Sequence, residues 1–121
     1  MTFRFRKFPV YKDIREFIKL IFIVSSKFPQ IYQYDLGTQM RKAAISILLN
    51  LAEGSGRNSD KEFNRFLMIA IGSIDEVVAG SDVALDNCLI TQKTYLQIVK
   101  KAESITKQLG GFSKKLKKTI N

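Results

Sequence analysis

The chain has 121 residues, and its 20 Lys and Arg outnumber its 11 Asp and Glu, which gives a formal net charge of +9. Its hydrophobic fraction of 45% is ordinary for a soluble protein, and the length suits a single domain over residues 1–121. No histidine is present, which removes the commonest general base and metal ligand, and one cysteine excludes an intrachain disulfide. These features disfavour an enzyme and favour an anionic partner, with no cofactor or metal expected.

The apolar run at residues 20–24 follows a basic N-terminal segment, an order also found in secretory signal peptides. Asp13, Glu16 and Lys19 interrupt the pattern, and no small-residue cleavage site follows the run. The run is also too short to span a bilayer. We therefore expect a cytoplasmic protein, in agreement with the single unpaired cysteine.

Apolar residues three and four positions apart predict a first helix over residues 9–27, bounded by two prolines. Leu20 and Phe22 widen its apolar arc well beyond one core stripe, and Ile23 lies outside even that arc. A small bundle covers a helix on one side only. The first helix is therefore expected to contact a second subunit as well.

The connection over residues 27–37 is long for a helical bundle, and its Ile31 and two tyrosines predict that it packs against the bundle. A second helix is expected over residues 38–53. Ile45 and Leu49 lie opposite its apolar stripe, so they extend the candidate contact surface between subunits.

A tight turn is predicted between the second and third helices. Gly54 suits the left-handed position just after a helix, and Ser59 suits the N-cap of the next one. Glu62 completes the spacing of a capping box. Glu53 and Arg57 are placed to pair across the turn, a structural role that we favour over catalysis.

The third helix is expected over residues 60–87. Gly72 and Gly80 either weaken it or allow close helix contact, and we favour contact. Met68 lies off the apolar face and joins the candidate contact surface. Cys88 continues the apolar face, which predicts a buried and unreactive thiol.

The fourth helix is expected over residues 92–118, because its apolar register continues unbroken through a pair of glycines. In an antiparallel hairpin Asp86 would lie near Lys93, and Asp82 near Lys100 or its neighbours, as weak surface pairs. No strand pattern is present. The sequence therefore predicts an all-α, antiparallel, up-down-up-down four-helix bundle.

A family resemblance covers residues 10–109. It is carried by LAEGSGRNSDKEFNRFLMIAIGSIDE, preceded by LGTQMRKAAISILLN. This core resembles the four-helix-bundle proteins encoded in 23S rRNA intervening sequences, and is similar to the accessory variability proteins of diversity-generating retroelements. The resemblance implies a ring-shaped homopentamer. For the retroelement branch it also implies binding of nucleic acid and of a reverse transcriptase.

Short turns make the second, third and fourth helices alternate in direction, and we assume that the first is antiparallel to the second. The N-terminus, the turn after the second helix and the end of the fourth helix would then share one pole. Ten cations gather there against three carboxylates, so this pole holds seven of the nine net charges. The ten candidate nucleic-acid-binding residues are Arg4, Arg6, Lys7, Arg57, Lys61, Arg65, Lys114, Lys115, Lys117 and Lys118. Phe3, Phe5 and Phe8 are interleaved with them, either to stack on bases or to pack against the bundle.

Three functions remain open at this point. The first is non-catalytic binding of the RNA or DNA backbone at the basic pole. The second is a protein-interaction scaffold, for example for a reverse transcriptase. The third is a purely structural oligomer whose charged termini are only solvated. In each case the candidate oligomer interface consists of Leu20, Phe22, Ile23, Ile45, Leu49 and Met68.

Overall fold

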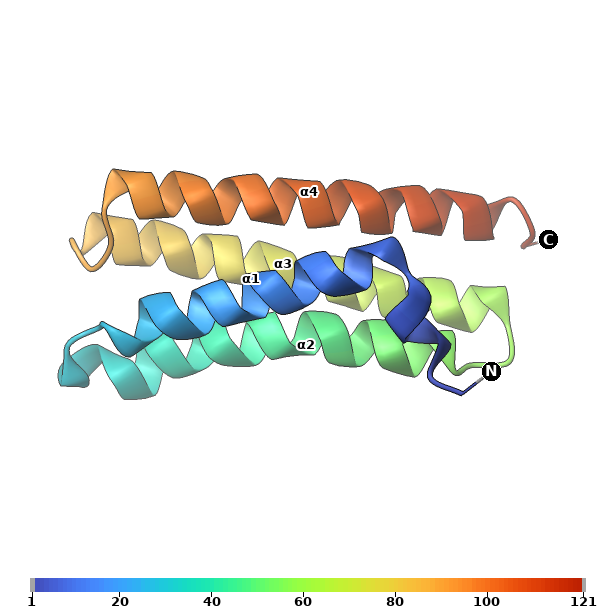
Figure 1. Ribbon diagram of the computed structural model, residues 1–121, viewed down its shortest axis with the longest axis horizontal. Helices are drawn as coiled ribbons and strands as arrows, with labels where there is room; N and C mark the ends of the chain where they lie inside the picture. Colours follow the sequence, from blue (N-terminus) through green and yellow to red (C-terminus); the bar gives the residue numbers. More distant parts are fainter. Residues whose placement is uncertain (1, 121) are drawn as a thin grey trace.

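Four long helices make up the computed structural model, which describes residues 2–120 (Figure 1). They are α1 (Pro9–Ser26), α2 (Thr38–Ser55), α3 (Asp60–Asp86) and α4 (Gln92–Lys117), with short helical turns at η1 (Arg4–Lys7), η2 (Gln30–Tyr32) and η3 (Gln33–Gly37). The predicted bounds differ from these by at most two residues. Successive long helices run in opposite directions, which confirms the antiparallel four-helix bundle.

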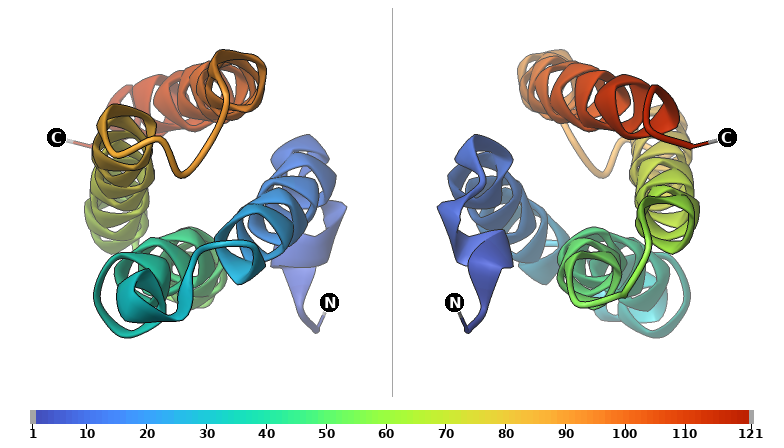
Figure 2. Two further views of the ribbon diagram at one scale, coloured as in Figure 1. Left: turned by 90° about the vertical axis from the view of Figure 1, so that its left-hand side faces the viewer. Right: turned by 90° about the vertical axis from the view of Figure 1, so that its right-hand side faces the viewer.

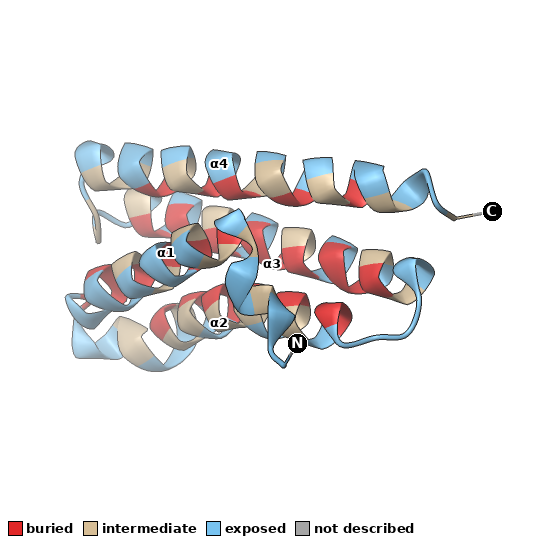
Figure 3. Ribbon diagram, turned by 45° about the vertical axis from the view of Figure 1, so that its right-hand side comes forward, coloured by how far each residue is buried: buried red, intermediate tan, exposed pale blue. Residues whose placement is uncertain are grey.

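The helices are arranged in chain order around one core (Figure 2). α2 lies between α1 and α3, α3 lies beside α4, and α1 also contacts α4. At the α1–α4 contact the Gln108 side-chain amide donates a hydrogen bond of 2.7 Å to the Asp13 carboxylate. Buried positions line the inward face of each helix, and exposed positions line the outward face (Figure 3).

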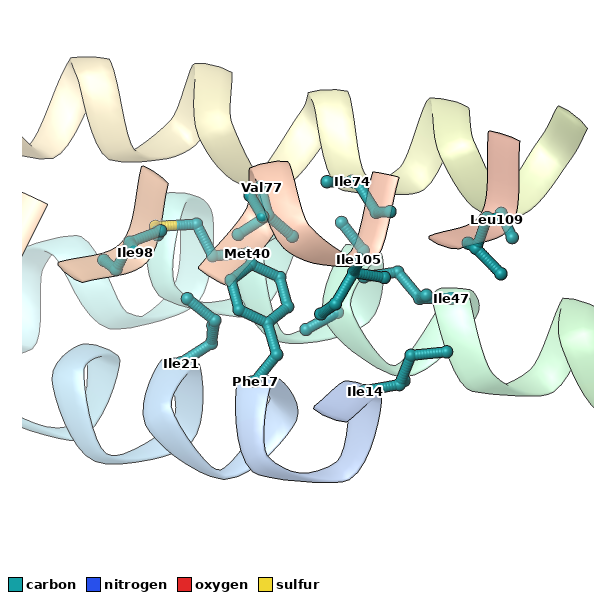
Figure 4. Close-up of a cluster of buried hydrophobic side chains, with 14 of the residues drawn as sticks. Ile14, Phe17, Ile21, Met40, Ile47, Ile74, Val77, Ile98, Ile105 and Leu109 are labelled. Carbon is teal, nitrogen blue, oxygen red and sulfur yellow. The ribbon is translucent and has the colours of Figure 1, made fainter. Parts of the chain in front are cut away.

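Each helix contributes large apolar side chains to the shared core (Figure 4). Phe17 of α1, Ile47 of α2, Ile74 of α3 and Ile105 of α4 are all at most 2% exposed. Complete burial of one such side chain stabilises the fold by roughly 1.5–3 kcal/mol. The three- and four-residue spacing that predicted the helices therefore also identified the core face.

Gly54 does not end α2 in a left-handed conformation, so that prediction is wrong. It is buried within α2, and no glycine among residues 2–120 has a positive φ. A Cβ atom at Gly54 would lie 2.7 Å from Cβ of Phe66 and 2.9 Å from Cδ1 of Phe63. Glycine is needed here because α3 approaches the backbone of α2 closely.

The two glycines inside α3 have different roles. A Cβ atom at Gly80 would lie 2.7 Å from Cγ of Met40 in α2, which confirms the predicted close contact at that position. A Cβ atom at Gly72 would meet no atom within 4 Å, so the same prediction is wrong for Gly72 within the chain.

The start of α3 is capped as the sequence predicts. The backbone N–H of Glu62 donates a hydrogen bond of 3.1 Å to Oγ of Ser59. The Glu62 carboxylate, however, accepts a hydrogen bond of 2.9 Å from Nε of Arg65. One half of the capping box is therefore present, and the acid of the other half pairs with an arginine instead.

The connection between α1 and α2 packs only in part. The Gln33 side-chain amide donates a hydrogen bond of 2.9 Å to the Ser25 carbonyl, and Tyr32 packs against the core. Ile31 and Tyr34 are 77% and 83% exposed, so the prediction that they pack is wrong. Ile31 lies in η2 and Tyr34 in η3, and both side chains point outward from these short turns.

Cys88 is exposed, so the prediction of a buried thiol is wrong. Its φ is 57°, in the left-handed region. The Cys88 N–H bonds to the Leu85 carbonyl at 3.1 Å, and the Leu89 N–H bonds to the Ala84 carbonyl at 2.9 Å. These two bonds form a Schellman motif, which ends α3 and turns Cys88 away from the apolar face.

In the part of the chain from residue 2 to residue 120, no helix combines the length and hydropathy that crossing a membrane requires.

Replacing Cys88 with glycine should raise the free energy of unfolding by about 1 kcal/mol, because glycine adopts the left-handed conformation without the side-chain clash. Urea unfolding at a fixed protein concentration measures this change. Cys88→Ala keeps the strain and should be nearly neutral. A Cys88→Gly variant less stable than Cys88→Ala would contradict the assignment.

Replacing Gly54 with alanine should destabilise the protein by about 1–3 kcal/mol, because the added methyl overlaps Phe66 and Phe63. Gly72→Ala is the matched control within a helix. Its methyl meets open space, so better helix propensity should stabilise it by up to about 1 kcal/mol. Thermal unfolding of the two variants should shift in opposite directions, and equal shifts would refute the close approach at Gly54.

Candidate nucleic-acid interface

The N-terminal segment, the turn after α2 and the end of α4 lie at the same end of the bundle (Figure 1). Thr119, just after α4, donates a hydrogen bond to the carboxylate of Asp60 at the start of α3. The guanidinium carbon of Arg4 in η1 lies 5.5 Å from the centre of the Phe63 ring in α3. The structure thus brings three segments that are distant in sequence to one surface.

We call this surface the basic pole. It holds all ten candidate binding residues: Arg4, Arg6 and Lys7 in η1, Arg57 in the turn, Lys61 and Arg65 in α3, Lys114, Lys115 and Lys117 in α4, and Lys118 after it. All ten are exposed. Their binding role stays a prediction.

Three aromatic rings attach the N-terminal segment to the pole. The Phe8 ring centre lies 4.9 Å from that of Phe112 in α4 and 6.1 Å from that of Phe63 in α3. Phe5 also packs against the core, whereas Phe3 is 58% exposed. Phe5 and Phe8 therefore pack against the bundle while staying partly exposed, and Phe3 is the most exposed of the three N-terminal rings.

Several arginines of the pole lie against aromatic rings. The guanidinium carbons of Arg57 and Arg65 lie 5.0 and 4.5 Å from the centre of the Phe66 ring. That of Arg6 lies 5.0 Å from the Phe3 ring. Such contacts orient a guanidinium while leaving donors free for an anion. The sequence did not indicate this support, because Phe66 has the spacing of an ordinary core residue.

Two arginines of the pole have carboxylate partners. Arg57 pairs with Glu53, as the sequence predicts, and Arg65 pairs with Glu62 at 2.9 Å. The hydrogen bond from Arg65 lowers the pKa of Glu62, and the same bond raises the pKa of Arg65. All four side chains are well exposed, so each pair contributes little to stability.

The other eight cations of the pole have no carboxylate within 4 Å among the described residues. Four of them follow one another closely at the end of α4, from Lys114 to Lys118. There they also complement the negative end of the helix dipole. The pole is therefore strongly positive and mostly free to meet an external anion.

The predicted pairs between α3 and α4 do not form. Only the two ion pairs of the pole occur between residues 2 and 120, so Asp86 does not pair with Lys93, nor Asp82 with Lys100. Asp82 instead accepts a hydrogen bond of 2.6 Å from the Tyr95 hydroxyl, which raises the pKa of Tyr95. Tyrosine, an uncharged donor, reaches the carboxylate across the short α3–α4 turn.

No three carboxylate or cysteine side chains gather closely enough to hold a metal ion in the region from residue 2 to residue 120.

The predicted oligomer interface is at least partly exposed throughout. Leu20 and Ile45 are half-buried, and Phe22, Ile23, Leu49 and Met68 are 40–61% exposed. Ile69 is 41% exposed as well, but the sequence did not predict it as part of this interface. Oγ of Ser73 donates to Oγ of Ser46 at 2.9 Å, so Leu49 and Ile69 lie at the same level of α2 and α3. An interface role for these residues stays a prediction.

These features define an all-α, antiparallel four-helix bundle with a basic pole at one end. The chain belongs to the 23S rRNA-intervening sequence protein family, whose model matches residues 6–111. The match includes α1, α2, α3 and most of α4, whereas the lysines from Lys114 to Lys118 lie beyond it. A comparison with curated proteins gives no match.

Proposed function

We propose that this protein binds the phosphate backbone of nucleic acid at its basic pole, without catalysing a reaction. The observation that carries this proposal is the set of eight exposed cations at one end that have no carboxylate within 4 Å among residues 2–120. The description of the family refers to an intervening sequence of 23S rRNA, so RNA is the first ligand to test.

Such a surface is suited to phosphates more than to base edges. Lysine ammonium groups act as flexible point charges, and the two arginines that lie on Phe66 keep the N–H donors that their carboxylate partners do not use. Contacts of both kinds hold a nucleic acid in position without reading its sequence. Affinity should therefore depend strongly on salt and weakly on sequence.

We further propose that the protein acts as a ring-shaped homopentamer. The exposed apolar side chains on α1, α2 and α3 support an interface between copies, since contiguous apolar surface is unfavourable in water. With parallel subunit axes, five poles of net charge +7 would form one face of about +35 before counterion screening. The free, exposed thiol of Cys88 suits the cytoplasm, to which we assign this activity.

Neutralising the lysine cluster should weaken binding of a mixed RNA pool. The variant carries Lys114→Gln, Lys115→Gln, Lys117→Gln and Lys118→Gln. On single strands, the slope of log affinity against log salt should flatten by about 0.7 for each phosphate that the variant no longer neutralises. Fluorescence anisotropy at several salt concentrations measures both quantities, and the bundle should stay folded because all four side chains are exposed.

The matched control removes four positive charges that lie outside the basic pole. It carries Lys19→Gln, Lys42→Gln, Lys93→Gln and Lys100→Gln, all at exposed positions. It should bind nearly as well as the unmodified protein. Equal reductions in affinity from both variants would indicate a diffuse positive surface. If the pole variant binds as tightly as the unmodified protein, binding at the pole is refuted and the scaffold function becomes the better hypothesis.

Replacing Leu49 with aspartate should dissociate the oligomer, because a charge would enter an apolar contact. Light scattering after gel filtration should give about five times 13.8 kDa for the unmodified protein and a smaller mass for the variant. Ile31→Asp is the control, since Ile31 is 77% exposed on η2 and outside the candidate interface. A monomeric unmodified protein at micromolar concentration would refute the proposal.

A further inference from the structure

A cavity of about 380 Å³ lies between the start of α1 and the last turns of α4. Phe8, Pro9 and Val10 line it from the α1 side, and Gly111 and Phe112 from α4. Its lining is mostly apolar, and its volume falls in the range of about 300–1,000 Å³ of small-ligand sites. Phe8 and Lys115 belong to the basic pole predicted from the sequence, but the cavity that they line was not predicted.

Two lysines give the cavity its charge. Lys107 and Lys115 also line it, one turn before and one turn after Gly111, so one lysine lies on each side of that glycine along α4. Both are exposed, and neither has a carboxylate within 4 Å in the described part of the chain. An occupant should therefore combine an apolar body with negative charge on both sides.

The two rings offer a surface for such a body. The planes of Phe8 and Phe112 are inclined at 80°, with centres 4.9 Å apart, and both rings are only half-buried. A planar group that stacks on one ring would lie nearly perpendicular to the other, and perpendicular arrangements are favoured between aromatic groups.

We propose that this cavity holds one unpaired base of a single-stranded RNA, while Lys107 and Lys115 contact the phosphates on either side. This inference rests on the proposed function and deepens it, because it names single strands as the preferred ligand. The bases of a duplex are paired and stacked within the helix, so they do not enter a protein cavity unless they are unpaired first. A base that stacks on an aromatic side chain binds with little dependence on its identity.

Gly111 allows a direct test. Gly111 lines the cavity, and a Cβ atom added there would meet no atom within 4 Å, so a side chain can begin at this wall without a clash at its Cβ. Gly110 has equally free surroundings, but it does not line the cavity. Leucine at either position should improve helix propensity to the same degree. The two variants therefore differ mainly in whether the cavity is blocked.

The experiment compares Gly111→Leu with Gly110→Leu in the full-length protein. Fluorescence anisotropy measures binding of a labelled oligouridine of about 12 nucleotides and of an RNA duplex of about the same length. Gly111→Leu should bind the single strand about tenfold more weakly, the reduction expected for one stacked base, and should bind the duplex as before. Gly110→Leu should match the unmodified protein on both probes, and Gly111→Ala should show a smaller reduction in single-strand binding.

Other outcomes overturn the inference. If Gly111→Leu binds the single strand as well as Gly110→Leu does, no base enters the cavity. If it weakens single-strand and duplex binding equally, the cavity does not distinguish them. If light scattering shows that Gly111→Leu alone dissociates the oligomer, a second copy of the chain fills the cavity. Failure of the proposed function has a different signature, namely binding that does not respond to the lysine cluster at the end of α4.

Discussion

The close approach of α2 and α3 at Gly54 organises the basic pole. Because Gly54 has no side chain, Phe63 and Phe66 of α3 pack directly against the backbone of α2. Phe66 then supports Arg57 and Arg65, and Phe63 contacts the rings that hold the N-terminal segment and the end of α4. One backbone contact thus positions charged residues from three separate segments.

The distribution of charge follows from this packing. The carboxylates of the pole are occupied locally: Glu53 and Glu62 pair with nearby arginines, and Asp60 accepts from Thr119. The lysines at the end of α4 are left without carboxylate partners among the described residues. Surface pairs of this kind are weak, so the pole stays positive as a whole even though some of its arginines are paired.

The sequence predicted correctly those features that depend on periodicity and on local contacts. It predicted wrongly some features that depend on packing between helices or on how a helix ends. The cap at Ser59 and the uninterrupted α4 depend on local contacts, and both are confirmed. The role of Gly54, in contrast, depends on its contact with α3, a different helix. Cys88 has the spacing of a core residue, but a Schellman motif ends the helix before it can point inward.

The sequence by itself determined the helix count, the helix bounds within two residues, the core face and the end of the bundle at which the cations gather. The helices and the core face follow from the 3.6-residue period, and the alternation of the last three helices follows from short turns, both of which are local in the chain. The direction of the first helix was an assumption that the structure confirms. Only the tertiary structure decided which arginines lie on rings, which acids pair with them, and that a cavity opens between Phe8 and Phe112. Those features require distances of a few ångströms between residues that are far apart in sequence, and a linear pattern does not contain them.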